Sequence, residues 1–451
     1  MSSISNSATP PPALMRRVTF AAAIGNTIET YDYAVYGFLT IVLAKLFFPD
    51  SQPGVALLSA FAVFGVAFVV RPLGSLLFGS IADRIGRRPS LVATLVLMAL
   101  ATTAIGLLPT AASVGVWAPI LLVGCRLLQG LAAGGEYGTA MTYAAEFTPQ
   151  RKRGAMTSRV QIGSVASLLL AAGMVLLLNA ILTPAQLETW GWRIPFLIAL
   201  PLGLIGLWIR ATLEESPEFR ALEQRGAVTS SPAKESFVKH WRLIVLVFGI
   251  AAFQQIGYYV AFTYAQSYII QLGFTQKQAT LATVISIAVA VVLVAVGGPL
   301  SDRWGRWPML LWLSAAMLVL AYPLFAALSS ATSLAAVVFF TVLLGVVPAL
   351  YTSVAPATYI EVVPARVRAT VFAVGFALAA ALLGGPALYV SQFLVRLTGD
   401  NRAPAYFLMF GALVSLVAAL VVRRQRPQVL APDLAVAAAD GVPTARSQQG
   451  V

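Results

Sequence analysis

The chain has 451 residues, of which 59% are hydrophobic and only 10% are charged, and its mean hydropathy is +0.84. Soluble domains carry about 25% charged residues, so this composition excludes an ordinary soluble protein. The net charge of +13 would suit a nucleic-acid-binding protein, but the positions of the charges along the chain argue against that class.

Apolar runs recur along the chain from residue 18 to residue 424. A bilayer core about 30 Å thick needs roughly 20 apolar residues per spanning helix. The runs therefore predict an all-α integral membrane protein with twelve transmembrane helices. These helices are expected at 18–47, 55–81, 89–109, 114–147, 157–181, 192–211, 243–270, 277–300, 307–328, 331–361, 367–397 and 402–424.

Polar segments divide the chain into five parts. Residues 212–242 contain five Glu residues, several basic residues and a Ser-Ser-Pro break, so we interpret them as a cytoplasmic linker. The linker separates an N-terminal six-helix bundle (18–211) from a C-terminal one (243–424). Residues 1–17 are expected to be a cytoplasmic segment without a signal peptide. Residues 425–451, rich in Ala, Pro and Val, are expected to be a disordered cytoplasmic tail.

Lys and Arg are distributed asymmetrically across the predicted membrane. Of the 30 such residues, 22 fall on one side and five on the other. This excess marks the cytoplasmic side, so both termini are predicted to be cytoplasmic in a multi-pass protein of a bacterial cell membrane. The basic residues orient the chain in the lipid bilayer, and we expect no nucleic-acid partner.

Two sequence patterns occur once in each half of the chain. Residues 79–89 read GSIADRIGRRP and residues 298–308 read GPLSDRWGRWP, at an offset of 219. Two helices later, Glu146 matches Glu361 at an offset of 215. We infer the duplication of a six-helix unit into two pseudo-symmetric bundles. Parallel halves with a binding site between them are a transporter architecture.

The repeated loops contain a candidate gate. A Gly lets two helices approach closely, and an Asp at a helix end can accept hydrogen bonds from a neighbouring helix N-terminus or pair with an Arg. Such a contact can be made in one conformation and broken in another. The alternative is an inward-facing loop with ordinary positive charges. The candidate gate residues are Gly79, Asp83, Arg84, Gly86, Arg87, Glu146, Arg153, Asp302, Arg303, Arg306 and Glu361.

The double loop motif resembles the signature of the major facilitator superfamily. Further segments resemble its metabolite:proton symporter branch, which carries citrate, 2-oxoglutarate, shikimate, and proline or betaine. The resemblance is dense over residues 20–220 and looser afterwards. It implies twelve helices in two bundles, alternating access and proton coupling. The segments are GNTIETYDY (25–33), RPLG (71–74), RLLQG (126–130), GGEYG (134–138) and GWRIPF (191–196).

Acidic residues inside the predicted helices are the candidates for proton coupling. Glu29 and Asp32 share one helix face with Tyr33 and Tyr36, and Glu136 lies within the fourth helix. A carboxyl group in a low-dielectric site can exchange a proton near neutral pH. The only histidine lies at the linker, so carboxylates must carry the protons. The alternative is a structural salt bridge to an Arg within the membrane.

Two buried cations are candidates for substrate binding. Arg71 is predicted near mid-membrane and Arg126 at a comparable depth, and Arg recognises carboxylates with a bidentate fork. The alternative role is charge balance for the carboxylates. The remaining candidates are the polar and aromatic residues Tyr33, Tyr36, Gln129, Gln254 and Tyr258, although packing is an equally simple explanation for the tyrosines.

The sequence favours a secondary transporter that imports a small organic acid or zwitterion with protons. The membrane Arg residues favour an anionic carboxylate slightly. We expect a monomer that needs no ATP and no cofactor or metal, and no enzymatic activity, because no metal-binding cluster or nucleophile motif is present. The alternatives are an exporter or exchanger of a hydrophobic solute, a transporter-like sensor and a membrane enzyme.

Overall fold

The computed structural model describes residues 12–49, 53–212, 214–226, 228 and 232–439, and in these ranges every regular element is a helix. Eleven described stretches are long and apolar enough to cross a membrane. α1 (Pro12–Phe47) has 36 residues, which at 1.5 Å per residue is also long enough to span. The predicted all-α fold with twelve membrane helices is confirmed.

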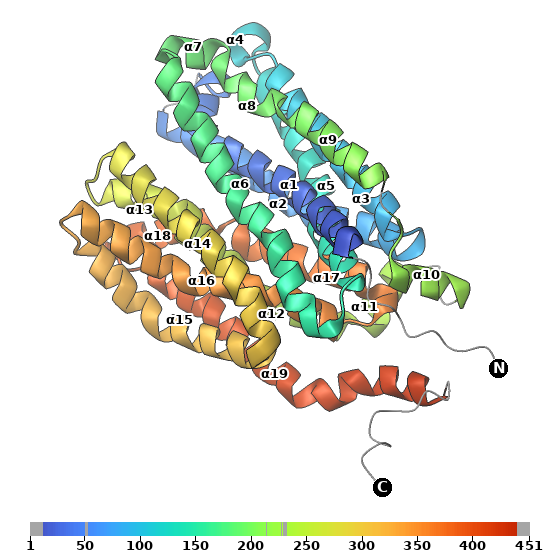
Figure 1. Cartoon of the computed structure of the whole chain (residues 1–451). Coiled ribbons are helices and arrows are strands. Elements are labelled where there is room, and N and C mark those ends of the chain that lie inside the picture. The colour runs from blue at the N-terminus through green and yellow to red at the C-terminus, as the bar shows by residue number, and fades with distance from the viewer. Residues whose placement is uncertain (1–11, 50–52, 213, 227, 229–231, 440–451) are drawn as a thin grey trace.

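The helices form two bundles that lie side by side (Figure 1). The first contains α1, α2 (Pro53–Arg84), α3 (Arg87–Leu107), α4 (Ala111–Val114), α5 (Trp117–Glu146), α6 (Arg153–Ile181), α7 (Pro184–Thr189), α8 (Ile194–Leu197) and α9 (Ala199–Ala211). The second contains α12 (Trp241–Tyr259), α13 (Ala265–Gln271), α14 (Gln276–Trp304), α15 (Arg306–Ser329), α16 (Leu334–Val362), α17 (Arg368–Ala379), α18 (Ala387–Thr398) and α19 (Pro404–Ala439).

Two short helices, α10 (Pro217–Gln224) and α11 (Pro232–Lys239), connect the bundles. Both lie at the same end of the molecule, here called the linker end, whereas α4, α7 and α13 lie at the opposite end, here called the far end (Figure 1). α10 begins where Ser216 caps it, since the Ser216 hydroxyl accepts the N–H of Phe219. The linker is therefore ordered helix over part of its length.

Gly86 and Gly305 form the turns of the two repeated loops. Their φ angles are +131° and +92°, in the region that glycine adopts without a steric penalty. The next residues, Arg87 and Arg306, begin α3 and α15. The sequence repeat is thus also a repeat of backbone geometry.

Two helices of the second bundle contain a π-helical turn. Val260–Tyr264 joins α12 to α13, and Ala380–Gly384 lies between α17 and α18. Such turns are often found at functional sites. Here Phe262 and Thr263 of the first turn line the cavity described below.

The C-terminal end differs from the sequence-based expectation. α19 remains helical to Ala439, whereas disorder was expected from residue 425 onward. The segment is rich in Ala and Val and contains Leu, and the helix propensity of Ala and Leu is high. The expectation for residues 440–451, like that for residues 1–11, falls outside the described residues.

Candidate functional site

A cavity of about 930 Å³ lies between the two bundles. α1, α2, α5 and α6 contribute lining residues from the first bundle, and α12, α13, α14, α17 and α18 from the second. The lining reaches Leu187 of α7 and Lys277 of α14, both in helices that end at the far end (Figure 1). The cavity therefore extends from the interior toward the far end.

An ion pair faces this cavity. Glu29 on α1 and Arg71 on α2 both line it, and Arg71 Nη2 lies 3.3 Å from Glu29 Oε1. The rings of Tyr33 and Phe68 each lie 4.4 Å from the Arg71 guanidinium carbon, so cation–π contacts hold the Arg71 side chain in place. Both charged side chains are only 7% exposed.

Several buried polar atoms around the cavity have no hydrogen-bond partner. The donors include Asn26 Nδ2, Gln255 Nε2 and the Tyr258 hydroxyl, and Glu29 Oε2 is an acceptor. A buried polar atom without a partner costs about 1–3 kcal/mol, and a ligand in the cavity could remove that cost. The lining therefore offers hydrogen-bond donors for the carboxylate of a ligand. It also offers the Glu29 carboxylate, which can attract a cation.

Asp32 and Arg126 form a second ion pair, which lies outside the cavity lining. Arg126 Nη1 lies 3.3 Å from Asp32 Oδ2, and Gln129 Nε2 donates to Asp32 Oδ1 at 2.6 Å. Gln129 also contacts Thr102 on α3 at 2.9 Å. Arg126 and Gln129, both sequence candidates for substrate binding, are thus engaged with Asp32 inside the first bundle.

Glu136 belongs to a third buried pair. Arg210 binds both of its oxygens, at 3.0 Å for the Nη1–Oε2 contact, and Thr94 donates to Oε2 at 2.5 Å. Arg210 lies one residue before the end of α9 and is fully buried. In the sequence, Arg210 stands next to the charged linker and is one of the 22 basic residues on the predicted cytoplasmic side. Its pairing with Glu136 depends on helix packing, which the sequence does not reveal.

A chain of side-chain hydrogen bonds crosses between the bundles beside the cavity. Tyr359 donates to Gln254 Oε1 at 2.6 Å, Gln254 Nε2 donates to Tyr137 at 3.3 Å, and Tyr137 donates to Gln161 at 3.0 Å. The Tyr137 ring stacks on Phe376 at 4.1 Å. Gln254 and Tyr258, two sequence candidates for substrate binding, line the cavity, whereas Tyr36 donates to Ala60 O outside the lining.

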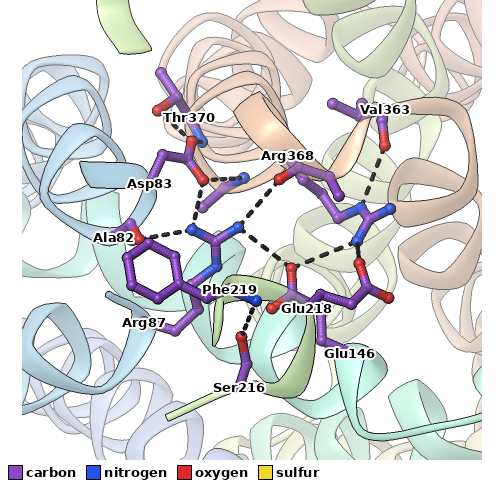
Figure 2. A network of polar contacts seen from close by, with 12 residues as sticks. Ala82, Asp83, Arg87, Glu146, Ser216, Glu218, Phe219, Val363, Arg368 and Thr370 are labelled. Atoms are coloured by element: carbon purple, nitrogen blue, oxygen red, sulfur yellow. Dashed lines mark hydrogen bonds and ion pairs between the residues drawn. The ribbon is translucent and has the colours of Figure 1, made fainter. Parts of the chain in front are cut away.

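The linker end of the molecule is closed by contacts between the bundles (Figure 2). Asp83 Oδ2 accepts the N–H of Thr370 at 2.8 Å and its hydroxyl at 2.7 Å, and Oδ1 accepts the N–H of Ala369 at 3.3 Å. These are the second and third residues of α17. Asp83 on the first bundle therefore caps a helix of the second.

The second bundle makes the equivalent contact in return. Asp302 Oδ1 accepts the N–H of Gly154 at 2.9 Å and Oδ2 that of Ala155 at 2.8 Å, the second and third residues of α6. Asp83 pairs with Arg87 and Asp302 with Arg306, both at 2.9 Å. The gate candidates of the two halves are thus arranged with pseudo-twofold symmetry.

Further ion pairs extend this closure. Glu146 Oε1 lies 3.3 Å from Arg87 Nη2 and 3.4 Å from Arg368 Nη1, and Arg306 pairs with Glu361 at 2.9 Å. Figure 2 shows Arg87 and Arg368 converging on Glu146. Glu146 is thereby bound from both bundles.

Glu218 of the linker helix α10 joins the same network. Arg153 Nη2 lies 2.7 Å from Glu218 Oε1, and Arg368 binds Oε2. The neighbouring Glu215 accepts the N–H groups of Arg87 and Arg88 at 2.9 and 3.1 Å. The contacts of these linker glutamates could not be predicted from sequence, because nothing in the linker sequence indicates where α10 docks.

The remaining gate candidates take different positions. Gly79 lies so close to α17 that a Cβ atom on it would be 3.0 Å from Thr370 Cα, so the absence of a side chain permits the contact. Arg84 and Arg303 are exposed. Among the described residues, no group of three or more His, Cys, Asp or Glu side chains is placed to hold a metal ion.

A family model described as "Sugar (and other) transporter" matches residues 18–239 and 223–424. A proline/betaine transporter of Salmonella typhimurium is 38% identical over 415 residues, covering 89% of this chain and 82% of that protein. A glycine betaine/proline/ectoine/pipecolic acid transporter of Dickeya dadantii is 37% identical, with coverages of 91% and 83%. A citrate-proton symporter of Klebsiella pneumoniae is 32% identical, with coverages of 89% and 90%.

Solved structures share the fold. The proton:xylose symporter XylE of the major facilitator superfamily, bound to 6-bromo-6-deoxy-D-glucose, superposes with a TM-score of 0.77 at 20% identity. The match covers 91% of this chain and 96% of XylE. The human organic anion transporter MFSD10 gives a TM-score of 0.69 at 17% identity and covers 91% and 100%.

Proposed function

This chain belongs to the sugar (and other) transporter family within the major facilitator superfamily, and from that premise we propose that it carries a small zwitterion of the proline or betaine type together with protons. It is a multi-pass membrane transporter, and its relatives include both zwitterion carriers and a citrate-proton symporter. The choice between these substrate classes rests on the cavity.

The observation that carries the proposal is the charge balance of the cavity. Among the described lining residues, Glu29 and Arg71 are the charged pair in the interior, and Lys277 lies near the far end. Arg126, which made an anionic substrate attractive from sequence, is bound to Asp32 outside the lining. A tricarboxylate would bring several negative charges to a wall whose interior charges cancel, and burying an unpaired charge is costly. A zwitterion brings no net charge.

The lining also has groups for both ends of a zwitterion. The unpartnered donors Asn26, Gln255 and Tyr258 suit the carboxylate. The cationic end suits the aromatic faces of the cavity, among them the adjacent rings of Tyr258 and Tyr259, 5.5 Å apart, because aromatic faces attract quaternary ammonium groups. The ion pair on the wall disfavours a purely hydrophobic solute.

Proton coupling is assigned to Glu29 and Asp32. Each is a buried carboxylate paired with one guanidinium group, and each pairing weakens when the carboxylate binds a proton. Glu29 contacts the substrate space directly, whereas Asp32 is linked to it only through α1. Protonation of Glu29 would therefore be the step that releases Arg71 toward a substrate carboxylate.

Transport is proposed to proceed by alternating access in a single chain. Both bundles line one cavity, so one chain supplies a complete pathway, and a proton gradient in place of ATP supplies the energy. The linker end is taken as cytoplasmic, in accord with the distribution of Lys and Arg. The structure then corresponds to a state open toward the outside and closed by the Asp83 and Asp302 caps.

The test is electrogenic uptake in proteoliposomes. Glycine betaine, proline and citrate are each offered with and without an inward proton gradient. We expect a current with glycine betaine or proline that grows with the gradient, because a neutral zwitterion and a proton together carry one positive charge. Accumulation of citrate alone would overturn the zwitterion assignment and would instead support an organic-acid carrier.

A further inference from the structure

The Glu136–Arg210 pair has no role in the cavity, yet it lies in the middle of the first bundle. Glu136 is ten residues from the linker-end terminus of α5, about 15 Å along the helix axis. Its carboxylate and the Arg210 guanidinium are both buried. Ionisable groups at such depth are costly, and chains of them form proton relays in membrane proteins.

A narrow gap, too small for a water molecule, lies between Glu136 and the cavity wall. Glu29, Thr94, Leu95, Met98 and Glu136 line this gap, so Glu29 borders the cavity on one side and the gap on the other. The Glu29 Oε2 atom is buried and has no hydrogen-bond partner. The two carboxylates are therefore consecutive polar groups on a path that leads away from the substrate.

The other side of the pair leads to the linker end. Arg210 also donates to Leu91 O at 2.5 Å, while the two residues that follow it, Ala211 and Thr212, are exposed. The groups that face Glu136 are Arg210 from α9, Thr94 from α3 and Glu29 from α1, with Arg71 of α2 behind Glu29. This set leads from the cavity to within one helical turn of the linker.

We propose that Glu136 is the second carrier of the transported proton, on a route through the first bundle that is separate from the substrate pathway. The O–H bond breaks at the Glu29 carboxyl group and forms at the Glu136 carboxylate once a side-chain movement brings the two groups together. Protonated Glu136 loses its charge attraction to Arg210. Release of the proton to water at the linker end restores that ion pair, so Arg210 positions Glu136 and favours release.

This inference rests on the proposed proton-coupled transport, and the test separates the two. Glu136→Gln is compared with the wild type in proteoliposomes by proton-driven accumulation of glycine betaine or proline and by counterflow, which requires no net proton release. We expect loss of accumulation with counterflow retained. A wild type without proton-coupled uptake would refute the proposed function, whereas proton-driven accumulation in Glu136→Gln would refute the relay alone. An equal fall in both measurements would make the pair structural.

Other variants keep the test decisive if Glu136→Gln does not fold. Glu136→Gln/Arg210→Gln removes both charges and leaves no unpaired ion, and the same loss of accumulation is expected. Arg210→Lys retains the charge but not the bidentate contact, so the pH profile of uptake should shift; an unchanged profile would overturn the role of Arg210. Glu188→Gln, in an exposed pair with Lys45 at 2.7 Å, is the control that should behave as wild type.

Discussion

Arg153 and Arg368 occupy equivalent positions in the two bundles, 215 residues apart, and both bind the carboxylate of Glu218. Arg153 begins α6 and Arg368 begins α17, the two helices that Asp302 and Asp83 cap. One carboxylate of the linker therefore bridges the two halves at the point where they must separate. The linker is part of the closure as well as a connection.

Glu218→Gln should favour opening at the linker end. Losing hydrogen bonds to a charged group costs about 1.5–3 kcal/mol, which corresponds to a roughly tenfold or larger shift in the equilibrium. The measurement is labelling of Ala373→Cys from the linker side, because Ala373 lies against Gly138 between the bundles. The chain's single cysteine, Cys125, is replaced by Ser so that only the new thiol reacts. Labelling should accelerate. Glu214→Gln, in the exposed pair with Arg220, is the matched control, and equal rates in the two variants would contradict the prediction.

Asp83→Asn should slow transport and leave substrate affinity nearly intact. The side chain contacts α17 at the linker end and does not line the cavity. The measurements are the turnover rate in proteoliposomes and the Kd for glycine betaine or proline in detergent. Asp302→Asn should have a comparable effect through α6 because its contacts are equivalent. A folded Asp83→Asn protein that no longer binds substrate would instead make Asp83 part of the binding site.

Glu29→Gln should abolish proton-driven accumulation, because Gln cannot take up the proton at the cavity wall. The side chain has the same shape, so substrate binding should be affected less than coupling. Asp32→Asn should also lose coupling. The measurement is uptake driven by a pH gradient, and undiminished uptake in both variants would remove the two carboxylates from the coupling mechanism.

The two arginines of the first bundle should differ in their effects. Arg71→Ala removes a cation from the cavity wall and should weaken zwitterion binding. Arg126→Ala should mainly destabilise the fold, since removing one partner of a buried ion pair costs about 3–5 kcal/mol. Thermal unfolding and substrate affinity, measured on both variants, separate these outcomes. Equal loss of affinity without destabilisation in Arg126→Ala would place it in the site after all.

Tyr258→Phe should raise the KM for the zwitterion, because its hydroxyl is a buried donor without a partner in the protein. A hydrogen bond to a charged carboxylate contributes about 1.5–3 kcal/mol, so a change of roughly tenfold or more is expected. Tyr268→Phe provides the comparison: its hydroxyl donates to Asn401 O at 2.7 Å, outside the lining. An unchanged KM in Tyr258→Phe would remove this hydroxyl from the site.

The fold could be predicted from sequence because membrane helices are recognised by the length of their apolar runs. The duplicated loops are recognised by the constant spacing between matching residues. The partners of the buried charged residues could not be predicted from sequence. Glu29 and Asp32 are three residues apart, which turns their side chains by about 60° around the helix, and this rotation sends one to the cavity and the other to α5. Arg210 stands at the end of an apolar run, just before the charged linker, and the sequence does not show that its long side chain reaches inward to Glu136.

The reciprocal caps have a consequence for how the molecule is assembled. Asp83 satisfies backbone N–H groups of α17, and Asp302 satisfies those of α6, so each half lacks an acceptor that only the other supplies. Because the two duplicated halves of the protein cap each other's helices, neither half alone can form the closed linker end. Two separately expressed halves would still carry, between them, both Asp side chains and both of the helix ends that they cap. In this respect the two halves relate to each other as the subunits of a heterodimer do, although one polypeptide contains both.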